Sequence, residues 1–244
     1  MMRNYETETQ NRIAFIQRVL EDANSSSIVY GNSGGKDSAL VGILCKLACP
    51  DTVGVIMPIS SKQNYGQDTV DALAVAEQYG IATITVDLTP VKQSLVQQIS
   101  PAQMVNKTAD ININPRLRMT TLYAVGASRG ALVAGTGNRS EAYMGYFTKY
   151  GDGGYDFNPI ADLTVAEIYE FLRHLDAPKS ILTKPPSAGL FDGQTDEQEM
   201  GLTYADLDGF LLTGKGDAML IEKVQATHAK TEHKRNLPIM YQGK

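Results

Sequence analysis

The sequence predicts a single α/β domain, built on a doubly wound, Rossmann-like parallel sheet of about five strands flanked by helices. Two observations carry this prediction. Short apolar runs alternate with longer amphipathic segments between residues 28 and 134, which is the element order of right-handed βαβ crossovers. The length of 244 residues suits one substantial core and is short for two full domains. We therefore place residues 1–244 in one domain.

Each predicted element follows from its own pattern. Ile13, Ile16 and Leu20 recur at helical spacing, which predicts a helix over residues 5–23. The apolar run from Ile28 to Tyr30 is typical of a buried parallel strand. The same reasoning predicts strands over 53–57, 83–87 and 131–134, and helices over 39–48, 67–79, 90–99, 115–129, 204–212 and 217–231.

Two segments interrupt this alternation. Residues 135–160 mix several glycines with charged residues, a composition that rarely forms a core. We expect them to form a site at the edge of the sheet. Residues 184–199 are polar and have the composition of a mobile loop, which predicts a lid over that site.

Composition narrows the classes of function. A net charge of -5 gives no broad field for a nucleic-acid backbone, so we expect no nucleic-acid partner. No stretch approaches the apolar length of a membrane span, and the first ten residues lack the apolar region of a secretory signal. Cys45 and Cys49 lie four apart in an apolar helical pattern, which suits buried thiols better than a disulfide framework. We expect a soluble, cytoplasmic protein with no membrane partner.

The stretch "YGNSGGKDSAL", residues 30–40, is expected to bind phosphate. A glycine-rich turn between a strand and a helix presents backbone N–H groups and the positive end of the helix dipole to an anion. It is not a Walker A loop, because Asp37 follows Lys36 where that motif has a hydroxyl. A carboxylate among phosphates indicates a bridging Mg²⁺. An ordinary glycine turn, and a helix N-cap role for Asp37, remain the alternatives.

These residues carry a family resemblance. "SGGKDS" resembles the pyrophosphatase loop of the ATP-pyrophosphatase superfamily, whose fold is adenine nucleotide α-hydrolase-like. Further motifs occur in the order of ammonia-dependent NAD synthetases: "NPRLRMTTLYAVG", "GTGNRSE", "GYFTKYGDGG", "NPIADLT", "PPSAGLFDGQTDE" and "TEHKR". The resemblance implies a ligase that adenylates the nicotinate carboxylate of deamido-NAD with ATP, releasing pyrophosphate. Free ammonia then converts the adenylate to NAD and AMP. It also implies Mg²⁺ as the cofactor and a homodimer.

The resemblance also implies roles for individual residues. Asp37 and Glu141 would hold Mg²⁺. ATP would contact Gly31, Asn32, Ser33, Gly34, Gly35, Lys36, Asp37, Ser38, Thr136 and Ser187. Deamido-NAD would contact Arg116, Lys149, Asp152, Asp156, His233 and Lys234.

The chain departs from the family pattern at two places. Val165 stands where the family usually has a Lys that reaches ATP, and Lys36 is a candidate substitute for that contact. The segment "VIMP", which contains Ile56 and Met57, lacks an Arg that some members place near the nucleotide. Neither departure removes a proposed metal ligand.

Plainer interpretations stay open for several residues. Glu141 alone would be a solvated helix charge, Lys149 and Asp156 a weak surface ion pair, and His233 an exposed residue of a basic tail. For the whole chain, the alternatives are another adenylating enzyme of the superfamily and a non-catalytic nucleotide sensor. The first could be a tRNA-thiolating or a GMP-forming enzyme, and a tRNA enzyme would be expected to show a basic face or a catalytic cysteine pair. The second would not need both carboxylates. Glutamine dependence is disfavoured because 244 residues leave no room for an amidase domain.

Overall fold

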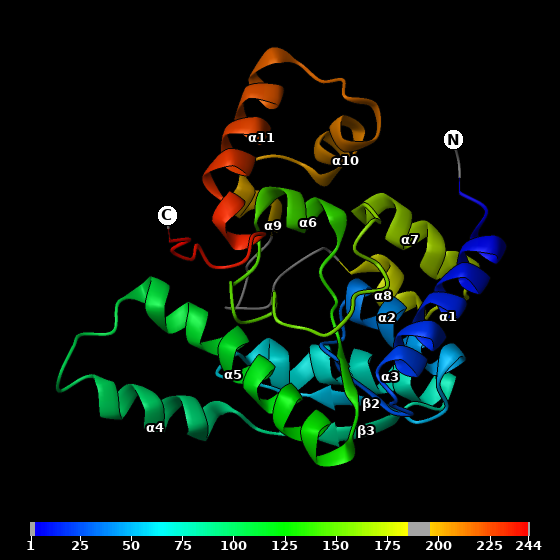
Figure 1. Cartoon of the computed structure of the whole chain (residues 1–244), viewed down its shortest axis with the longest axis horizontal. Helices are drawn as coiled ribbons and strands as arrows, with labels where there is room; N and C mark the ends of the chain where they lie inside the picture. Colours follow the sequence, from blue (N-terminus) through cyan, green and yellow to red (C-terminus); the bar gives the residue numbers. More distant parts are fainter. Residues whose placement is uncertain (1–2, 185–195, 244) are drawn as a thin grey trace.

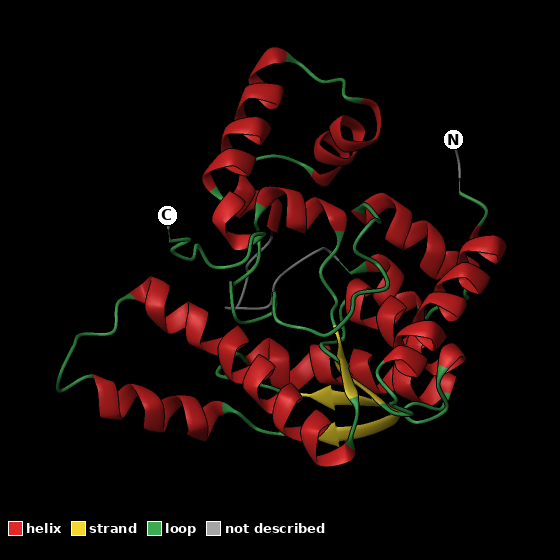
Figure 2. Cartoon of the chain, viewed as in Figure 1, coloured by secondary structure: helices red, strands yellow, loops and turns green. Residues whose placement is uncertain are grey.

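The computed structural model describes residues 3–184 and 196–243, and a parallel sheet lies at its centre (Figures 1 and 2). In the described residues the sheet has four strands in the order β3-β2-β1-β4. They are β1 (Ile28–Gly31), β2 (Thr52–Ile56), β3 (Ala82–Thr85) and β4 (Leu132–Ala134). The α/β prediction is confirmed, with four strands where about five were expected. Phe157 adds only a single parallel bridge to Ala134.

Helices cover both faces of the sheet, because the central strands are apolar on both sides. Ile28 and Tyr30 of β1 pack into the larger core, whereas the intervening Val29 packs on the opposite face. The larger core is shared with α1 (Tyr5–Asp22), α2 (Lys36–Ala48), α3 (Thr69–Tyr79) and α7 (Val165–His174). The long helix α5 (Lys107–Arg129) covers the opposite face.

The C-terminal helices form a smaller layer beside α6 (Arg139–Met144), away from the sheet (Figure 1). They are α9 (Asp196–Met200), α10 (Tyr204–Thr213), α11 (Ala218–Lys230) and the 3₁₀ turn η2 (Glu232–Lys234). Met144, Tyr204, Leu207 and Val224 form its core. Val165 belongs to the same apolar cluster and is 3% exposed, so packing occupies the position where the family usually has a cation.

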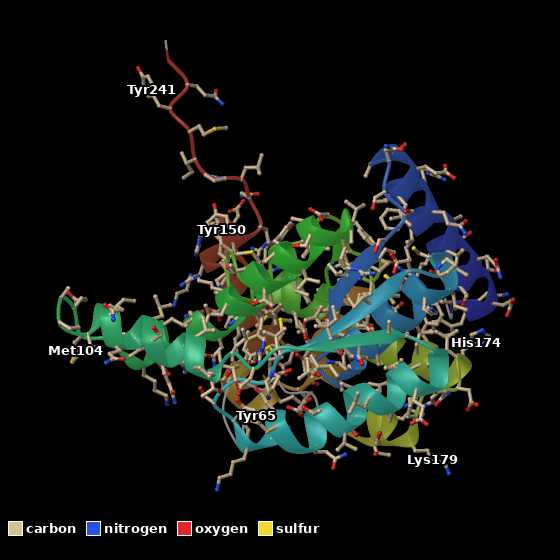
Figure 3. All side chains as sticks on the ribbon, turned by 90° about the horizontal axis from the view of Figure 1, so that it is seen from below. Tyr65, Met104, Tyr150, His174, Lys179 and Tyr241 are labelled. Atoms are coloured by element: carbon tan, nitrogen blue, oxygen red, sulfur yellow. The ribbon has the colours of Figure 1, made fainter. Side chains whose placement is uncertain are left out.

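Three further elements complete the described chain. They are the π-helical turn η1 (Asn64–Asp68), α4 (Thr89–Ile99) and α8 (Lys179–Thr183). Helix α4 and the start of α5 project from the body, and Figure 3 shows Met104 at the tip of this projection.

The structure differs from the sequence predictions in four segments. Helix α5 begins after Asn106, whose side chain caps Ala109 N at 2.9 Å, and it continues through Pro115, which the sequence had suggested as its start. Helix α7 was not predicted at all. The segment 135–160 contributes Phe157 and Ile160 to the core, and α9 occupies part of the expected loop 184–199.

The expectations about membrane spans and about the two cysteines can be compared with the described residues. None of their helices has both the length and the apolar character needed to cross a membrane. Cys45 and Cys49 are free and buried, as their spacing predicted.

Candidate active site

The candidate site lies where the strand order reverses. From β1 the chain builds β2 and β3 on one side, and it later returns to add β4 on the other. The loops that follow β1 and β4 therefore leave the same edge of the sheet beside each other, which is where ligands bind in open parallel sheets. A cavity of about 400 Å³ opens there, and both loops line it. This is the size of a small-molecule site.

At one position of the loop after β1, the backbone conformation and the space available suit only glycine. Gly34 has a φ of +71°, and a Cβ added there would lie 2.1 Å from the backbone oxygen of Asp68. Gly35 is the N-cap of α2, and no side chain caps that helix. The first N–H groups of α2 thus face the cavity edge without a side-chain acceptor, which suits an anionic ligand. Of residues 31–38, all except Gly34 line the cavity.

The two serines of this loop bond within the loop. Ser33 Oγ lies 3.0 Å from Ser38 Oγ, and Ser38 Oγ donates to Gly35 O at 3.0 Å. Asn32 is buried and donates through Nδ2 to Ala72 O at 3.0 Å. The hydroxyls expected to contact phosphate therefore also fix the shape of the loop that would receive it.

Asp37 and Glu141 converge on one buried ammonium group. Lys36 Nζ lies 2.7 Å from Asp37 Oδ2 and 4.0 Å from Glu141 Oε1, and the Lys36 side chain is only 5% exposed. Burial alone would lower the pKa of Lys36, but the charges of Asp37 and Glu141 outweigh it and raise that pKa. Burial and the charge of Asp37 together raise the pKa of Glu141 well above its usual value, although Lys36 opposes them. The three groups form one electrostatic unit.

Asn138 connects Asp37 with Glu141, and its role was missed from the sequence. It is fully buried and donates through Nδ2 to Asp37 Oδ1 at 3.0 Å. With Glu141 it forms a capping box at the start of α6: Glu141 N donates to Asn138 Oδ1 at 2.9 Å, and Asn138 N donates to Glu141 Oε2 at 3.2 Å. An Asn three residues before a Glu was the available signal. Glu141 is therefore no solvated helix charge, and Asp37 is not an N-cap.

The donor set can hold a divalent cation only with help from a ligand. In the described residues no group of three or more His, Cys, Asp or Glu side chains is gathered for a metal. Asp37 and Glu141 supply two hard carboxylates, and Mg²⁺ in nucleotide sites commonly takes one or two carboxylates together with phosphate oxygens and water. The pair fits that arrangement.

A second, partly buried cation contacts the loop of residues 31–38, called the glycine loop below. Lys184 Nζ donates to Gly34 O at 3.1 Å, to Asp68 Oδ1 at 2.7 Å and to Asp71 Oδ2 at 2.8 Å. Burial would raise the pKa of Asp71, but the hydrogen bond and charge of Lys184 lower it overall. This anchor was missed from sequence because its partners lie more than 100 residues away.

The residues expected to contact the dinucleotide divide into two groups. Asp152 and Lys234 line the cavity, as does Thr136, which was expected to contact ATP. The ammonium of Lys234 donates to Gly145 O and Phe147 O, both at 2.8 Å, so it also fixes the chain that follows α6.

Arg116, Lys149, Asp156 and His233 are not among the cavity-lining residues. Lys149 donates to the backbone oxygen of His233, so the expected surface pair of Lys149 with Asp156 does not form. Asp156 accepts hydrogen bonds from Tyr123 Oη at 3.0 Å and Val133 N at 2.7 Å, which ties it to α5 and β4. Ser187 lies outside the described residues.

Arg118, two residues after the expected Arg116, lines the cavity instead. Its Nε donates to Met57 O at 3.2 Å and its Nη2 to Asn64 Oδ1 at 2.9 Å. Within residues 3–184 and 196–243 it forms no ion pair with a carboxylate, and burial lowers its pKa. A guanidinium group held in this way is suited to an anionic ligand.

The chain is similar to several known proteins over nearly its whole length. The family model of NAD synthase matches residues 8–238. The chain is 46% identical over 238 residues to the NH(3)-dependent NAD(+) synthetase of Carboxydothermus hydrogenoformans, covering 96% of this chain and 97% of that protein. Among solved structures, the NMN synthetase of Francisella tularensis has a TM-score of 0.93 at 34% identity, covering 99% of this chain and all of that one. The NH3-dependent NAD synthetase of Campylobacter jejuni has a TM-score of 0.80 at 29% identity, covering 98% and 100%.

Proposed function

The chain belongs to the NAD synthase family and is an ATP-dependent ligase, and we propose that the cavity at the switch in strand order is where it makes NAD from deamido-NAD and free ammonia. The observation that carries this assignment is the pair Asp37 and Glu141, which two separate loops bring to one ammonium group beside an uncapped helix N-terminus. A sensor that only bound nucleotide would not need such a pair.

The loop after β1 has a place in the first step of the proposed reaction. The nicotinate carboxylate oxygen attacks the α-phosphorus of ATP, and the bond between the α and β phosphates breaks to release pyrophosphate. The N–H groups at the start of α2, with Ser33 and Ser38, would hold the departing phosphates. Ammonia then attacks the acyl carbon, the bond between that carbon and the AMP oxygen breaks, and AMP leaves as the nitrogen loses one proton to solvent. Catalysis here is mainly positioning and charge stabilisation.

We assign Asp37 and Glu141 as ligands of one Mg²⁺ ion, which when bound would neutralise charge on the leaving pyrophosphate. The geometry supports the assignment, because the two carboxylates lie around one ammonium group at the edge of the cavity and so carry one negative charge in excess of Lys36. Asn138 keeps Asp37 oriented toward the cavity. Thr136 and the first residues of the glycine loop, Gly31, Asn32 and Gly35, would contact the rest of ATP.

For the dinucleotide, we assign Arg118, Asp152 and Lys234 as cavity contacts. Arg116, Lys149, Asp156 and His233 would act from outside this cavity.

A homodimer is the proposed assembly. The 11-residue helix α4 buries only Lys92, while Val91 and Leu95 are exposed and Met104 beyond it is 78% exposed. A second copy would cover this apolar surface. The free thiols of Cys45 and Cys49 suit a reducing cytoplasm, where we place the protein.

The metal assignment can be tested by substitution. Asp37→Asn keeps the size of the side chain but removes a metal ligand, so we expect kcat to fall by at least ~100-fold with an unchanged circular dichroism spectrum. Asp51→Asn is the carboxylate control, because Asp51 lies just before β2, is half exposed, pairs with Arg129 and does not line the cavity; it should cost far less activity. Near-native turnover by Asp37→Asn would refute the ligand role.

A second substrate deserves a direct comparison because the NMN synthetase of Francisella tularensis superposes on this chain with a TM-score of 0.93. The alternative is amidation of the deamidated mononucleotide in place of deamido-NAD. Measuring kcat/KM for both substrates decides between them. We expect the dinucleotide to be preferred, and a higher kcat/KM for the mononucleotide would establish the alternative.

A further inference from the structure

We propose that Lys36 is a built-in counter-cation for Asp37 and Glu141, which competes with a divalent cation for these carboxylates and so makes metal binding depend on the nucleotide. The inference rests on the proposed function, since it takes the two carboxylates as the metal ligands. It concerns the state of the site before ATP arrives.

The geometry places the ammonium group of Lys36 between the carboxylates. Its Nζ lies 2.7 Å from Asp37 Oδ2 and 4.0 Å from Glu141 Oε1. The side chain is 5% exposed, so water screens these contacts poorly. The ring of Tyr204, from α10, also lies near this ammonium group, and Lys36 Nζ is 5.7 Å from the ring centroid. The lysine is thus held by groups from three helices: α2, α6 and α10.

Charge balance explains why the lysine would compete with a metal. Lys36 neutralises one of the two carboxylate charges, so the site attracts a divalent cation less strongly. One Asp37 oxygen, Oδ2, also already accepts a hydrogen bond from Lys36. The other Asp37 oxygen already accepts from Asn138, and Glu141 Oε2 accepts from the backbone of Asn138. The protein alone therefore offers a divalent cation few free ligand atoms. Phosphate oxygens of ATP would add ligands and charge, and would shift the balance toward the metal.

The alternative role for Lys36 is a direct phosphate contact that replaces the cation missing at Val165. That role would leave metal binding without nucleotide unchanged when Lys36 is removed, and would weaken ATP binding. The two roles therefore predict different results for the same variant.

The test measures Mn²⁺ binding to the full chain without nucleotide. The electron paramagnetic resonance signal of free Mn²⁺ reports how much of the metal remains unbound. Lys36→Met has a similar length and no charge, and we expect it to bind Mn²⁺ at least tenfold more tightly than the native chain. Lys36→Arg keeps the charge and should remain within threefold of native. Lys234→Met removes a cavity lysine whose ammonium donates to two carbonyl oxygens; it is the matched control and should not tighten binding.

The Mn²⁺ affinities of these variants decide between the two roles of Lys36. An unchanged Mn²⁺ affinity in a folded Lys36→Met variant overturns the inference. If Lys36→Met tightens binding and adding Asp37→Asn abolishes the gain, the inference and the ligand assignment both stand. If the gain survives Asp37→Asn, the carboxylate pair is not the metal site, and the proposed metal ligands fail along with it. Adding a non-hydrolysable ATP analogue should narrow the difference between native and Lys36→Met, and an equal difference in its presence would contradict the nucleotide dependence.

Discussion

Replacing Gly34 with Ala tests whether the glycine loop is held as rigidly as its contacts indicate. An alanine at a φ of +71° costs about 1–2 kcal/mol of backbone energy. Its Cβ would lie 2.1 Å from Asp68 O and 3.1 Å from Ala72 N, both backbone atoms that cannot rotate away. Overpacking of this kind costs about 1–3 kcal/mol. Because Lys184 bonds both Gly34 O and the Asp68 carboxylate, the loop cannot shift without losing that anchor.

The two costs together predict a loss of about 2–5 kcal/mol of unfolding free energy. For a chain of this size, that corresponds to a fall in Tm of roughly 5–20 °C. Thermal unfolding followed by circular dichroism measures it, and KM for ATP should rise in the same variant. Gly35→Ala is the matched control, because its backbone is extended and its Cβ would lie 3.4 Å from Ser33 Oγ, an ordinary contact. A Gly34→Ala protein that melts within 2 °C of native and keeps its KM for ATP would refute the reasoning.

Three further predictions address the neighbouring groups. Asn138→Asp keeps an N-cap for α6 but places a second negative charge against Asp37. We therefore expect a folded protein whose kcat/KM is at least ~10-fold lower than that of the native chain. A near-native kcat/KM would show that the orientation of Asp37 is unimportant. Asp71→Asn should lower stability at pH 7 because it breaks the ion pair with Lys184. The folded pKa of Asp71 is lowered, so its contribution is present above about pH 4 and is lost as the pH falls further. The difference in unfolding free energy between native and Asp71→Asn, measured in urea, should therefore shrink between pH 7 and pH 3, and a constant difference would contradict the assignment. Finally, glutamine in place of ammonium should give no NAD, as followed by chromatography, and glutamine-driven turnover would contradict the ammonia dependence.

The sequence was most informative where chemistry and local spacing coincide. The loop "SGGKDS" follows β1 and opens α2 as predicted, and Asp37 and Glu141 meet although more than 100 residues separate them. Their convergence follows from the parallel sheet, because β1 and β4 are neighbours whose following loops leave the same edge. The family resemblance implied this pair, and the neighbouring strands explain how two segments so far apart in the sequence come together.

The missed residues depend on packing between distant segments. Lys184 reaches Gly34 and Asp68 across the fold, and no local pattern around it indicates those partners. Arg118 was passed over in favour of Arg116, because helical geometry decides which of the two faces the cavity. Helix α7 was missed even though Val165, Ile168 and Leu172 give it a clear apolar face. Pro115 was read as a helix start, whereas the cap at Asn106 sets the beginning of α5.

The central claim is that ATP is split between its α and β phosphates to activate the carboxylate that ammonia then attacks. The direct measurement is a reaction with ATP, Mg²⁺, deamido-NAD and an ammonium salt, in which NAD, AMP and pyrophosphate are quantified together. We predict equal amounts of the three products, with none formed when deamido-NAD is left out. Formation of ADP and phosphate in place of AMP and pyrophosphate, or NAD formation without AMP, would contradict the account.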